Sequence, residues 1–225
     1  MHIPDGYISP QTGAAFYVLM APLWFLASKK VGAVLRARQV PYLALSASFI
    51  FVIMMFNVPI PGGSTGHAVG GTLAAVLLGP WAAMIAITVA LVVQALLFGD
   101  GGITAIGANC FNMAFILPFT GYFTYRILSA GSNKNSMRRA VSAAIGSYVG
   151  LNMAAFFTGL EFGIQPILHH TVDGKALYCP YGLVVALTAM MLEHLFLFGW
   201  VEAAVTFLAL RYLQNEDPGL IRDGL

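Results

Sequence analysis

Long apolar runs, separated by short polar segments, recur along the whole chain. A helix that spans a membrane needs about 20 mostly apolar residues, and seven runs are candidates. Their approximate bounds are 11–28, 41–57, 66–79, 81–98, 103–128, 139–160 and 181–211. The third run is short and rich in Gly and Ala, and Gly79-Pro80 divides it from the fourth because Gly can end a helix and Pro can begin one. The pattern predicts an all-α membrane protein, a helical bundle of about seven transmembrane helices.

The composition indicates a membrane protein without a soluble appendage. Hydrophobic residues make up 59% of the 225 residues and charged residues only 9%, against about 25% charged residues in soluble domains. We expect one integral membrane domain over residues 1–225, with an N-terminal loop (1–10), a helical bundle (11–211) and a polar, solvated cytoplasmic tail (212–225). The two cysteines, Cys110 and Cys179, form no CxxC and predict neither a metal motif nor a redox motif.

The basic residues predict the orientation of the bundle. With seven spans, ten of the eleven Lys and Arg residues fall on one side of the membrane, and Lys175 falls on the other. Basic loops mark the cytoplasmic side, so we expect the N-terminus outside and the C-terminus in the cytoplasm of a prokaryotic cell. No basic run is typical of a nucleic-acid partner. The ten residues on the cytoplasmic side are Lys29, Lys30, Arg36, Arg38, Arg126, Lys134, Arg138, Arg139, Arg211 and Arg222.

The chain opens with MHIPDGYISP, which places a histidine directly after the first methionine. No basic n-region or cleavage pattern precedes the first apolar run, so we expect the N-terminus, Met1 included, to be kept. The α-amine, the amide nitrogen of His2 and its imidazole Nδ1 then close two adjacent chelate rings around one ion. Such a planar nitrogen set favours Ni(II) or Cu(II), whereas zinc prefers a tetrahedron. Near neutral pH an α-amine, with a pKa of about 7.7–8.0, loses its proton readily.

A fourth nitrogen is needed, and His67 is the best candidate. It lies in PGGSTGHAVGG, at the outward end of the third run, where flanking glycines let another backbone approach closely. The alternative is a histidine satisfied by a neighbouring carbonyl. Ionisable residues within membrane spans are functional candidates by default, so we predict Met1, His2 and His67 as the metal-binding residues.

Three blocks of this chain resemble the NikM/CbiM family, the substrate-capture membrane subunits of energy-coupling-factor transporters for nickel and cobalt. The second block, with its GHxxGG, looks closer to the nickel members than to the cobalt members. The resemblance implies an extra N-terminal span that delivers the terminal loop into the bundle, where Met1, His2 and His67 hold the ion. The blocks are MHIPDGYIS, PGGSTGHAVGGTLAAVLLGPWAA and FGDGGITAIGANCFNMAF.

The resemblance also implies partners for the chain. These are a transmembrane coupling subunit, two cytoplasmic ATPases and, as an option, an additional small membrane subunit, together with membrane lipid. The chain has no G-x-x-x-x-G-K-[ST] match, so it does not power transport itself. Ni(II), or alternatively Co(II), is expected as transported substrate, with no organic cofactor and no enzymatic activity.

Several polar residues near the predicted site have two readings each. Asp5 either orients the His2 ring from behind or caps the turn at Pro4-Gly6. Buried amides either hold the terminal loop by hydrogen bonds or connect neighbouring helices; these amides are Gln94, Asn109 and Asn112. Ser64 and Thr65 are candidates to anchor the loop.

Other polar residues are assigned away from the metal site. His169 and His170 are read as part of a solvated outer loop, with a capture role as the alternative. Glu193, His194 and Glu202 are costly within the last span, and we expect Glu202 to pair with Arg126. His194 as a further metal ligand is the minor reading. Two small-residue stripes permit close helix contacts or docking to the coupling subunit: Gly66-xxx-Gly70-xxx-Ala74 and Ala44-xxx-Ser48.

Two other functions compete with metal capture. GGSTG at 62–66 matches G-x-S-x-G, so Ser64 with His67 or His194 as base would make an intramembrane serine hydrolase. That motif needs a strand-to-helix turn, and we expect no strand here. Ser64→Ala separates the two, since a hydrolase loses activity and a metal carrier still binds its ion. The third function, a channel, disagrees with a tight chelate because conduction requires weak binding.

Overall fold

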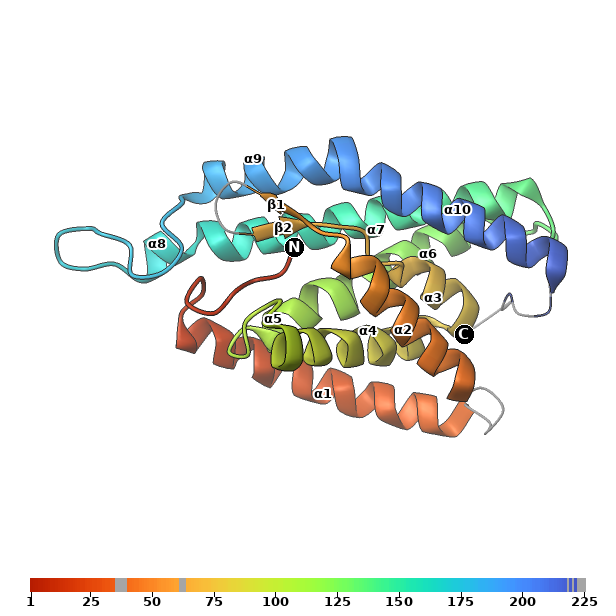
Figure 1. Cartoon of the computed structure of the whole chain (residues 1–225), viewed down its shortest axis with the longest axis horizontal. Helices are drawn as coiled ribbons and strands as arrows, with labels where there is room; N and C mark the ends of the chain where they lie inside the picture. Colours follow the sequence, from red (N-terminus) through yellow and green to blue (C-terminus); the bar gives the residue numbers. More distant parts are fainter. Residues whose placement is uncertain (35–39, 61–63, 218, 220, 222–225) are drawn as a thin grey trace.

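The computed structural model describes residues 1–34, 40–60, 64–217, 219 and 221. The chain forms a bundle of long helices whose axes run roughly along its longest dimension (Figure 1). Some residues used above lie outside the described residues. These are Arg36, Arg38 and Arg222 of the charge argument and Gly62 and Gly63 of the G-x-S-x-G match.

The first half of the chain contains helices on either side of a small hairpin. Helix α4 continues without a break into the π-helical segment η2. The elements are α1 (Pro10–Val34), α2 (Val40–Met55), β1 (Val58–Ile60), β2 (Ser64–Gly66), α3 (Gly71–Leu78), α4 (Pro80–Val93) and η2 (Gln94–Phe98).

The second half is built from longer helical rods, two of which contain a π-helical segment. The elements are α5 (Ile106–Asn109), η3 (Cys110–Ile116), α6 (Leu117–Leu128), α7 (Met137–Gly163), α8 (Gln165–Leu168), α9 (Leu183–Glu193), η4 (His194–Phe198) and α10 (Gly199–Glu216). A π-helical turn inserts one residue into a helix, re-aims the side chains around it and is frequent at functional sites.

Four helical rods in the described part of the chain are long and apolar enough to cross a membrane. They cover Pro10–Ala33, Pro80–Phe98, Met137–Leu168 and Leu183–Glu216. The α2 helix is apolar but shorter, with 16 residues. The prediction of a helical, multi-pass membrane protein is therefore confirmed.

The third predicted span differs from its expected form. Its helix, α3, has eight residues and starts at Gly71 rather than at 66, so it covers only about 12 Å of a hydrocarbon core of about 30 Å. Residues 64–66 are instead the second strand of an antiparallel hairpin, in which Ile60 pairs with Ser64. The expectation that this region holds no strand is wrong.

The start of α3 explains why the Gly66-Gly70-Ala74 stripe does not lie on one helix. Gly70 has a positive φ of 74° and ends the extended segment that follows the hairpin. A side chain would be strained in this conformation, which suits glycine. Gly66 lies in the strand, where the ring of Phe198 occupies the position a Cβ would take. Gly70 thus allows a turn of the main chain and Gly66 allows close packing against Phe198, and neither glycine lies in a helix–helix contact.

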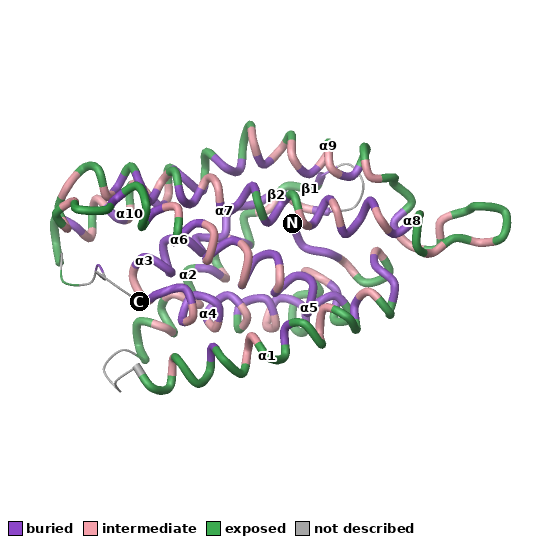
Figure 2. Tube along the Cα trace, turned by 180° about the vertical axis from the view of Figure 1, so that it is seen from behind, coloured by how far each residue is buried: buried purple, intermediate pink, exposed green. Residues whose placement is uncertain are grey.

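The buried surface lies on the inner faces of the bundle, and most of α1 is exposed along its outer side (Figure 2). Helices α6 and α7 pack closely where Gly121 faces Gly146. A Cβ on Gly146 would collide with the carbonyl oxygen of Gly121, so this close packing requires glycine. Such crossings of small residues are the usual form of tight helix packing in membranes.

The C-terminal region departs from the predicted solvated tail. Helix α10 continues to Glu216, beyond the expected end at 211. Gln214 is buried and donates from Nε2 to the carbonyl oxygens of Lys134 and Ser136 at 2.6 and 3.1 Å. Ile221 is buried as well. The first part of the 212–225 segment therefore belongs to the bundle.

Candidate metal centre

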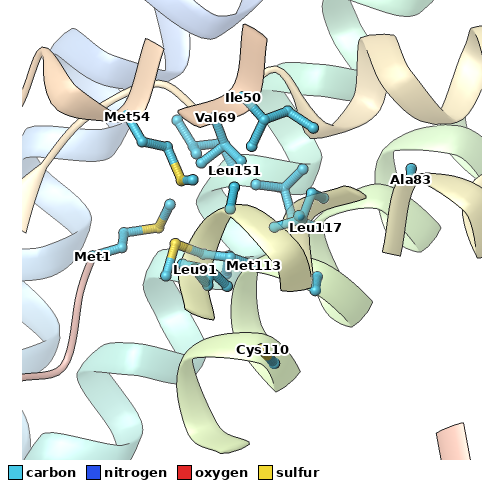
Figure 3. Close-up of a cluster of buried hydrophobic side chains, with 14 of the residues drawn as sticks. Met1, Ile50, Met54, Val69, Ala83, Leu91, Cys110, Met113, Leu117 and Leu151 are labelled. Atoms are coloured by element: carbon cyan, nitrogen blue, oxygen red, sulfur yellow. The ribbon is translucent and has the colours of Figure 1, made fainter. Parts of the chain in front are cut away.

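The N-terminus lies inside the bundle, between the hairpin and α5 (Figure 1). Chain termini are usually poorly ordered, yet Met1 and Ile3 are fully buried and His2 is 3% exposed. The Met1 side chain points into an apolar cluster that contains Met54 and Met113 (Figure 3). The first residue is therefore part of the core, which fixes the position of the α-amine.

Hydrogen bonds hold the main chain of the terminal segment on both sides. Asn109 accepts from the amide of Ile3 at 2.8 Å through Oδ1 and donates to its carbonyl at 3.1 Å through Nδ2. The hydroxyl of Ser64 donates to the carbonyl of His2 at 3.2 Å. Within the described residues, no acceptor contacts the amide of His2. This amide nitrogen is the one that the predicted chelate uses.

The His2 ring is oriented by its Nε2 atom. That atom lies 3.2 Å from Oε1 of Gln94, which is an acceptor, so the ring proton is assigned to Nε2. Nδ1 then keeps its lone pair. It lies 3.4 Å from a carboxylate oxygen of Asp100 and forms no hydrogen bond. The nitrogen that closes the six-membered chelate ring is therefore free to bind an ion.

His67 lies directly against His2 and has the complementary arrangement. The two rings stack with centroids 4.6 Å apart and planes inclined by 29°. Nδ1 of His67 lies 3.1 Å from the carbonyl oxygen of Ala68, and the fully buried Nε2 has no hydrogen-bond partner. Histidines that bind metals usually donate their other ring N–H to such an oxygen. The carbonyl expected under the alternative reading is present, but it engages only one of the two ring nitrogens.

Burial keeps these nitrogens unprotonated. It lowers the pKa of the Met1 α-amine to about 4, with Asp100 and Glu193 acting in the opposite direction. It lowers the pKa of His2 to about 3, helped by the positive amine. At neutral pH the amine and the His2 ring therefore present lone pairs, so little free energy is spent on removing protons from them.

The segment that carries His67 is held by a carboxylate from α10. Glu202 is fully buried and accepts from the amides of Val69 at 2.7 Å and Gly70 at 2.9 Å. Charge-assisted bonds of this kind are stronger than neutral ones, so Glu202 fixes the turn that follows His67. The predicted pair between Glu202 and Arg126 is wrong, since Arg126 donates instead to the hydroxyl of Tyr122 at 3.3 Å.

Two of the π-helical segments begin with a buried polar residue near the terminal amine. Gln94 is the first residue of η2 and contacts His2. His194 is the first residue of η4, and its charge interaction with His67 places the two rings in one neighbourhood. Nδ1 of His194 lies 2.7 Å from the carbonyl oxygen of Met190, and Nε2 has no partner. The structure thus places His194 closer to His67 than the sequence indicated.

No three His, Cys, Asp or Glu side chains form a preassembled metal cluster in the ranges 1–34, 40–60 and 64–217. The candidate centre is of another kind, since it combines two imidazole rings with two main-chain nitrogens. The unpartnered ring atoms, Nδ1 of His2 and Nε2 of His67, are the two that the chelate requires.

Comparison with known proteins gives the family of this chain. Residues 2–220 match the family CbiM, described as the cobalt uptake substrate-specific transmembrane region. The chain belongs to the CbiM family. This confirms the resemblance seen in the sequence.

Several members of the CbiM family are closely similar to this chain. The probable fused nickel transport protein LarMN of Lactiplantibacillus plantarum is 51% identical over 220 residues, which are 97% of this chain but 66% of that protein. The putative metal transport protein MJ1569 of Methanocaldococcus jannaschii is 44% identical over 98% of this chain and 94% of its own length. This chain spans slightly less than two thirds of the fused relative.

A solved structure supports the same assignment. A crystal structure described as a truncated transition metal transporter has a TM-score of 0.92 and 55% sequence identity to this chain. The similarity covers 96% of this chain and 99% of that one.

The role of Asp5 in this CbiM-family protein is neither of the two predicted. Its carboxylate accepts from the amides of Ile103 at 3.1 Å and Thr104 at 2.9 Å, and from the Thr104 hydroxyl. Those bonds lower the pKa of Asp5, the Thr104 side chain most of all. Asp5 therefore ties the terminal segment to the 101–104 loop. The carboxylate beside the His2 ring is Asp100, which the sequence reasoning missed although GDGG is an outer loop.

The other supporting residues separate into two groups. Gln94 and Asn109 contact the terminal segment, as one of the two readings expected. Asn112 instead donates to Thr158 and Glu161 on α7, which is the helix-connecting reading. Ser64 anchors His2, and Thr65 Oγ1 lies 3.5 Å from the α-amine.

The remaining candidates lie away from the terminal amine or show no catalytic contact. His169 packs edge-on against Tyr178, and His170 contacts the carbonyl of Pro166, both in the loop that projects at one end of Figure 1. Ser64 starts a strand, and helix α3 begins only at Gly71. The Ser64 hydroxyl donates to the main-chain carbonyl of His2 rather than to an imidazole ring. The hydrolase reading therefore lacks the turn and the base that it requires.

Asn109→Ala is expected to weaken Ni(II) binding by roughly 10- to 100-fold, as loss of an orienting contact does in other metal sites. The substitution removes both bonds to Ile3 and frees the terminal segment. Isothermal titration of the purified protein measures the change. Asn112→Ala is the matched control, since it removes a buried amide from the same rod without touching the segment. Equal losses in the two variants would contradict the assigned role.

Proposed function

We propose that the protein is the nickel-binding substrate-specificity subunit of an ATP-driven importer of the energy-coupling-factor type, with Co(II) as the alternative substrate. The observation that carries the proposal is the buried terminal amine beside two imidazole nitrogens without partners. Three relatives or neighbours are named as metal transport proteins, one of them for nickel. A binding subunit fits a site whose described residues offer nitrogen ligands without hydrogen-bond partners.

The chelate follows from the order of atoms along the chain. The amine and the amide nitrogen of His2 close a five-membered ring with the ion, and this amide with Nδ1 closes a six-membered ring. Nε2 of His67 supplies the fourth nitrogen, and its stacking against His2 supports this arrangement. A planar nitrogen set suits Ni(II) and Cu(II). Cu(II) binds such nitrogens at least as well, so selectivity in the cell rests on access and supply.

The proposed orientation puts the terminal segment at the outer face and the C-terminus in the cytoplasm. The short α3 and the extended segment before it together return the chain across the bundle, a form tolerated where irregular backbone is buried in protein. Residues 64 and 66–70 are buried, as this requires. Counted this way, the chain crosses the membrane seven times.

The proposed partners are a transmembrane coupling subunit and two cytoplasmic ATPases. This chain carries no phosphate-binding loop of the G-x-x-x-x-G-K-[ST] type, so hydrolysis falls to other chains. About one third of the length of the fused relative lies outside the stretch that it shares with this chain. A separate small membrane subunit is the corresponding partner that we propose here.

The absorption spectrum of the purified protein titrated with Ni(II) tests this function. A planar site of four nitrogens gives one d–d band near the blue end of the visible spectrum and a diamagnetic ion. A weakly coloured, paramagnetic six-coordinate ion, or no binding at all, would refute the proposed centre. Mg(II) and Ca(II), which prefer oxygen ligands, serve as controls and should leave the spectrum unchanged.

A further inference from the structure

A cavity of about 210 Å³ lies beside the candidate centre, between the hairpin and the outer end of α9. One face of α9 forms a wall, with Val185, Ala186, Ala189 and Met190. A water molecule takes about 30 Å³ of the liquid, so the cavity has room for an ion with its first shell of water. The other lining residues are Ile60, Ser64, Phe162, Cys179 and Tyr181.

At its inner end, the cavity is separated from the candidate nitrogen ligands by a single residue, Ser64. Ser64 lines the cavity, and its hydroxyl donates to the carbonyl of His2 at 3.2 Å. Met190 also lines it, and its carbonyl oxygen lies 2.7 Å from Nδ1 of His194. Behind Ser64 and Met190, one buried ring nitrogen each of His2, His67 and His194 has no hydrogen-bond partner. A buried acceptor without a hydrogen-bond donor costs free energy, and a bound cation would remove this cost.

The opposite side of the terminal segment is closed by protein. Gln94 covers the His2 ring at Nε2, and Asn109 clamps Ile3 from α5. Asp100 stands at Nδ1 with its side chain 19% exposed. Figure 1 shows the N-terminus between α5 and the hairpin. Ser64 of the hairpin lines the cavity and bonds to His2, so the cavity adjoins the hairpin side of the segment.

The rim of the cavity is itself tied to the terminal segment. The amide of Cys179 donates to the carbonyl of Tyr7 at 3.1 Å. Tyr181, which also lines the cavity, is 39% exposed. The cavity therefore extends from residues at the surface to residues bonded to the candidate ligands, and its polar groups are a hydroxyl, a thiol and a phenol.

We infer that this cavity is the vestibule through which a hydrated divalent transition-metal ion reaches the terminal nitrogens. The inference rests on the proposed function. The ion enters past Tyr181 and Cys179, exchanges water for the hydroxyl of Ser64 at the inner end, and passes to the amine and the imidazoles. A passage alters the rates of loading and unloading by the same factor, so blocking it changes kinetics and leaves the equilibrium constant unchanged.

Ala189→Trp tests the vestibule by filling it from the wall formed by α9. Val184→Trp is the matched control, because Val184 is on the same helix, is 78% exposed and does not line the cavity. Stopped-flow mixing with Ni(II) measures the association rate, and titration measures the dissociation constant. We expect Ala189→Trp to slow association by about tenfold or more with an affinity within about twofold of the wild type, and Val184→Trp to match the wild type in both.

Two results overturn the inference. One is loading of folded Ala189→Trp at the wild-type rate, and the other is an equal loss of rate in Val184→Trp. If Ala189→Trp fails to fold, Val185→Phe narrows the same cavity from a half-exposed position and is expected to slow loading in the same sense. If the wild-type protein binds no Ni(II), the proposed function fails; if it binds and the filled variants load normally, only the vestibule fails.

Discussion

A two-residue Gly-Ser extension ahead of Met1 is expected to reduce Ni(II) affinity by at least roughly 100-fold, about 2.7 kcal/mol, and to leave the helices folded. The extension moves the amine by about 7 Å of chain and removes the five-membered ring that it closes with the amide of His2. Met1 is fully buried, so the extra residues also have no room beside it. Titration with Ni(II) measures the affinity, and circular dichroism measures the helix content.

The length of the extension matters. A single added residue would make His2 the third residue of the chain, and an amine, two amides and an imidazole in that order form a planar nitrogen chelate by themselves. Two residues avoid this substitute site. The same Gly-Ser pair appended after Leu225 is the control, and it should bind like the wild type. Wild-type affinity in the N-terminally extended protein would show that the amine is no ligand.

The second large effect is expected for His67→Ala, which leaves three nitrogens at the centre. Loss of the fourth donor should lower Ni(II) affinity by roughly 100-fold, about 2.7 kcal/mol, and shift the d–d band to lower energy as water takes its place. The thermal midpoint should fall as well, since the His67 ring is fully buried against His2. Absorption titration gives both the affinity and the band position.

His169→Ala is the matched control for the His67 variant. His169 lies in the projecting loop before α9, where its ring packs against Tyr178 and its main chain bonds to Gln165 and Leu177. It should retain both the affinity and the spectrum. An unchanged band position in His67→Ala, whatever the affinity, would mean that the imidazole of His67 does not bind the ion.

The chelate proposed for the terminal segment could be derived from the sequence because its chemistry is local. An amine, an amide and an imidazole on adjacent residues have the same ring sizes in any fold, so His2 at position two was informative without coordinates. The assignment of His67 needed one additional step, its glycine-rich surroundings. The structure then brings His67 within stacking distance of His2, as that prediction requires.

The contacts that hold the segment could not be predicted in the same way, because they join residues far apart along the chain. Asp100 meets the ring of His2 across 98 positions (100 − 2), and Glu202 reaches Gly70 across 132. The guess that Glu202 pairs with Arg126 rested on depth and charge alone. A buried carboxylate is equally satisfied by main-chain amides, and the backbone before α3 supplies them.

Apolar runs predicted the long helices well and the third span poorly. Hydropathy registers how many apolar residues a stretch contains, and 66–79 has enough of them for a helix. It does not register that Gly66 and Gly70 give the chain an extended path and a left-handed turn. The π-helical turns at Gln94 and His194 were missed for the related reason that one inserted residue leaves the apolar pattern almost unchanged.

The burial of Met1 and the distant origin of its neighbours have a consequence for biosynthesis. During synthesis the first residues emerge before Asn109, which holds Ile3, and Glu202 emerges later still. Helix α10 must therefore be made before Glu202 can hold the turn that follows His67, so the candidate centre is completed late in folding. A translation product that stops before α10 would lack the carboxylate that holds this turn, and on the proposed function we expect it to bind Ni(II) less tightly than the finished subunit.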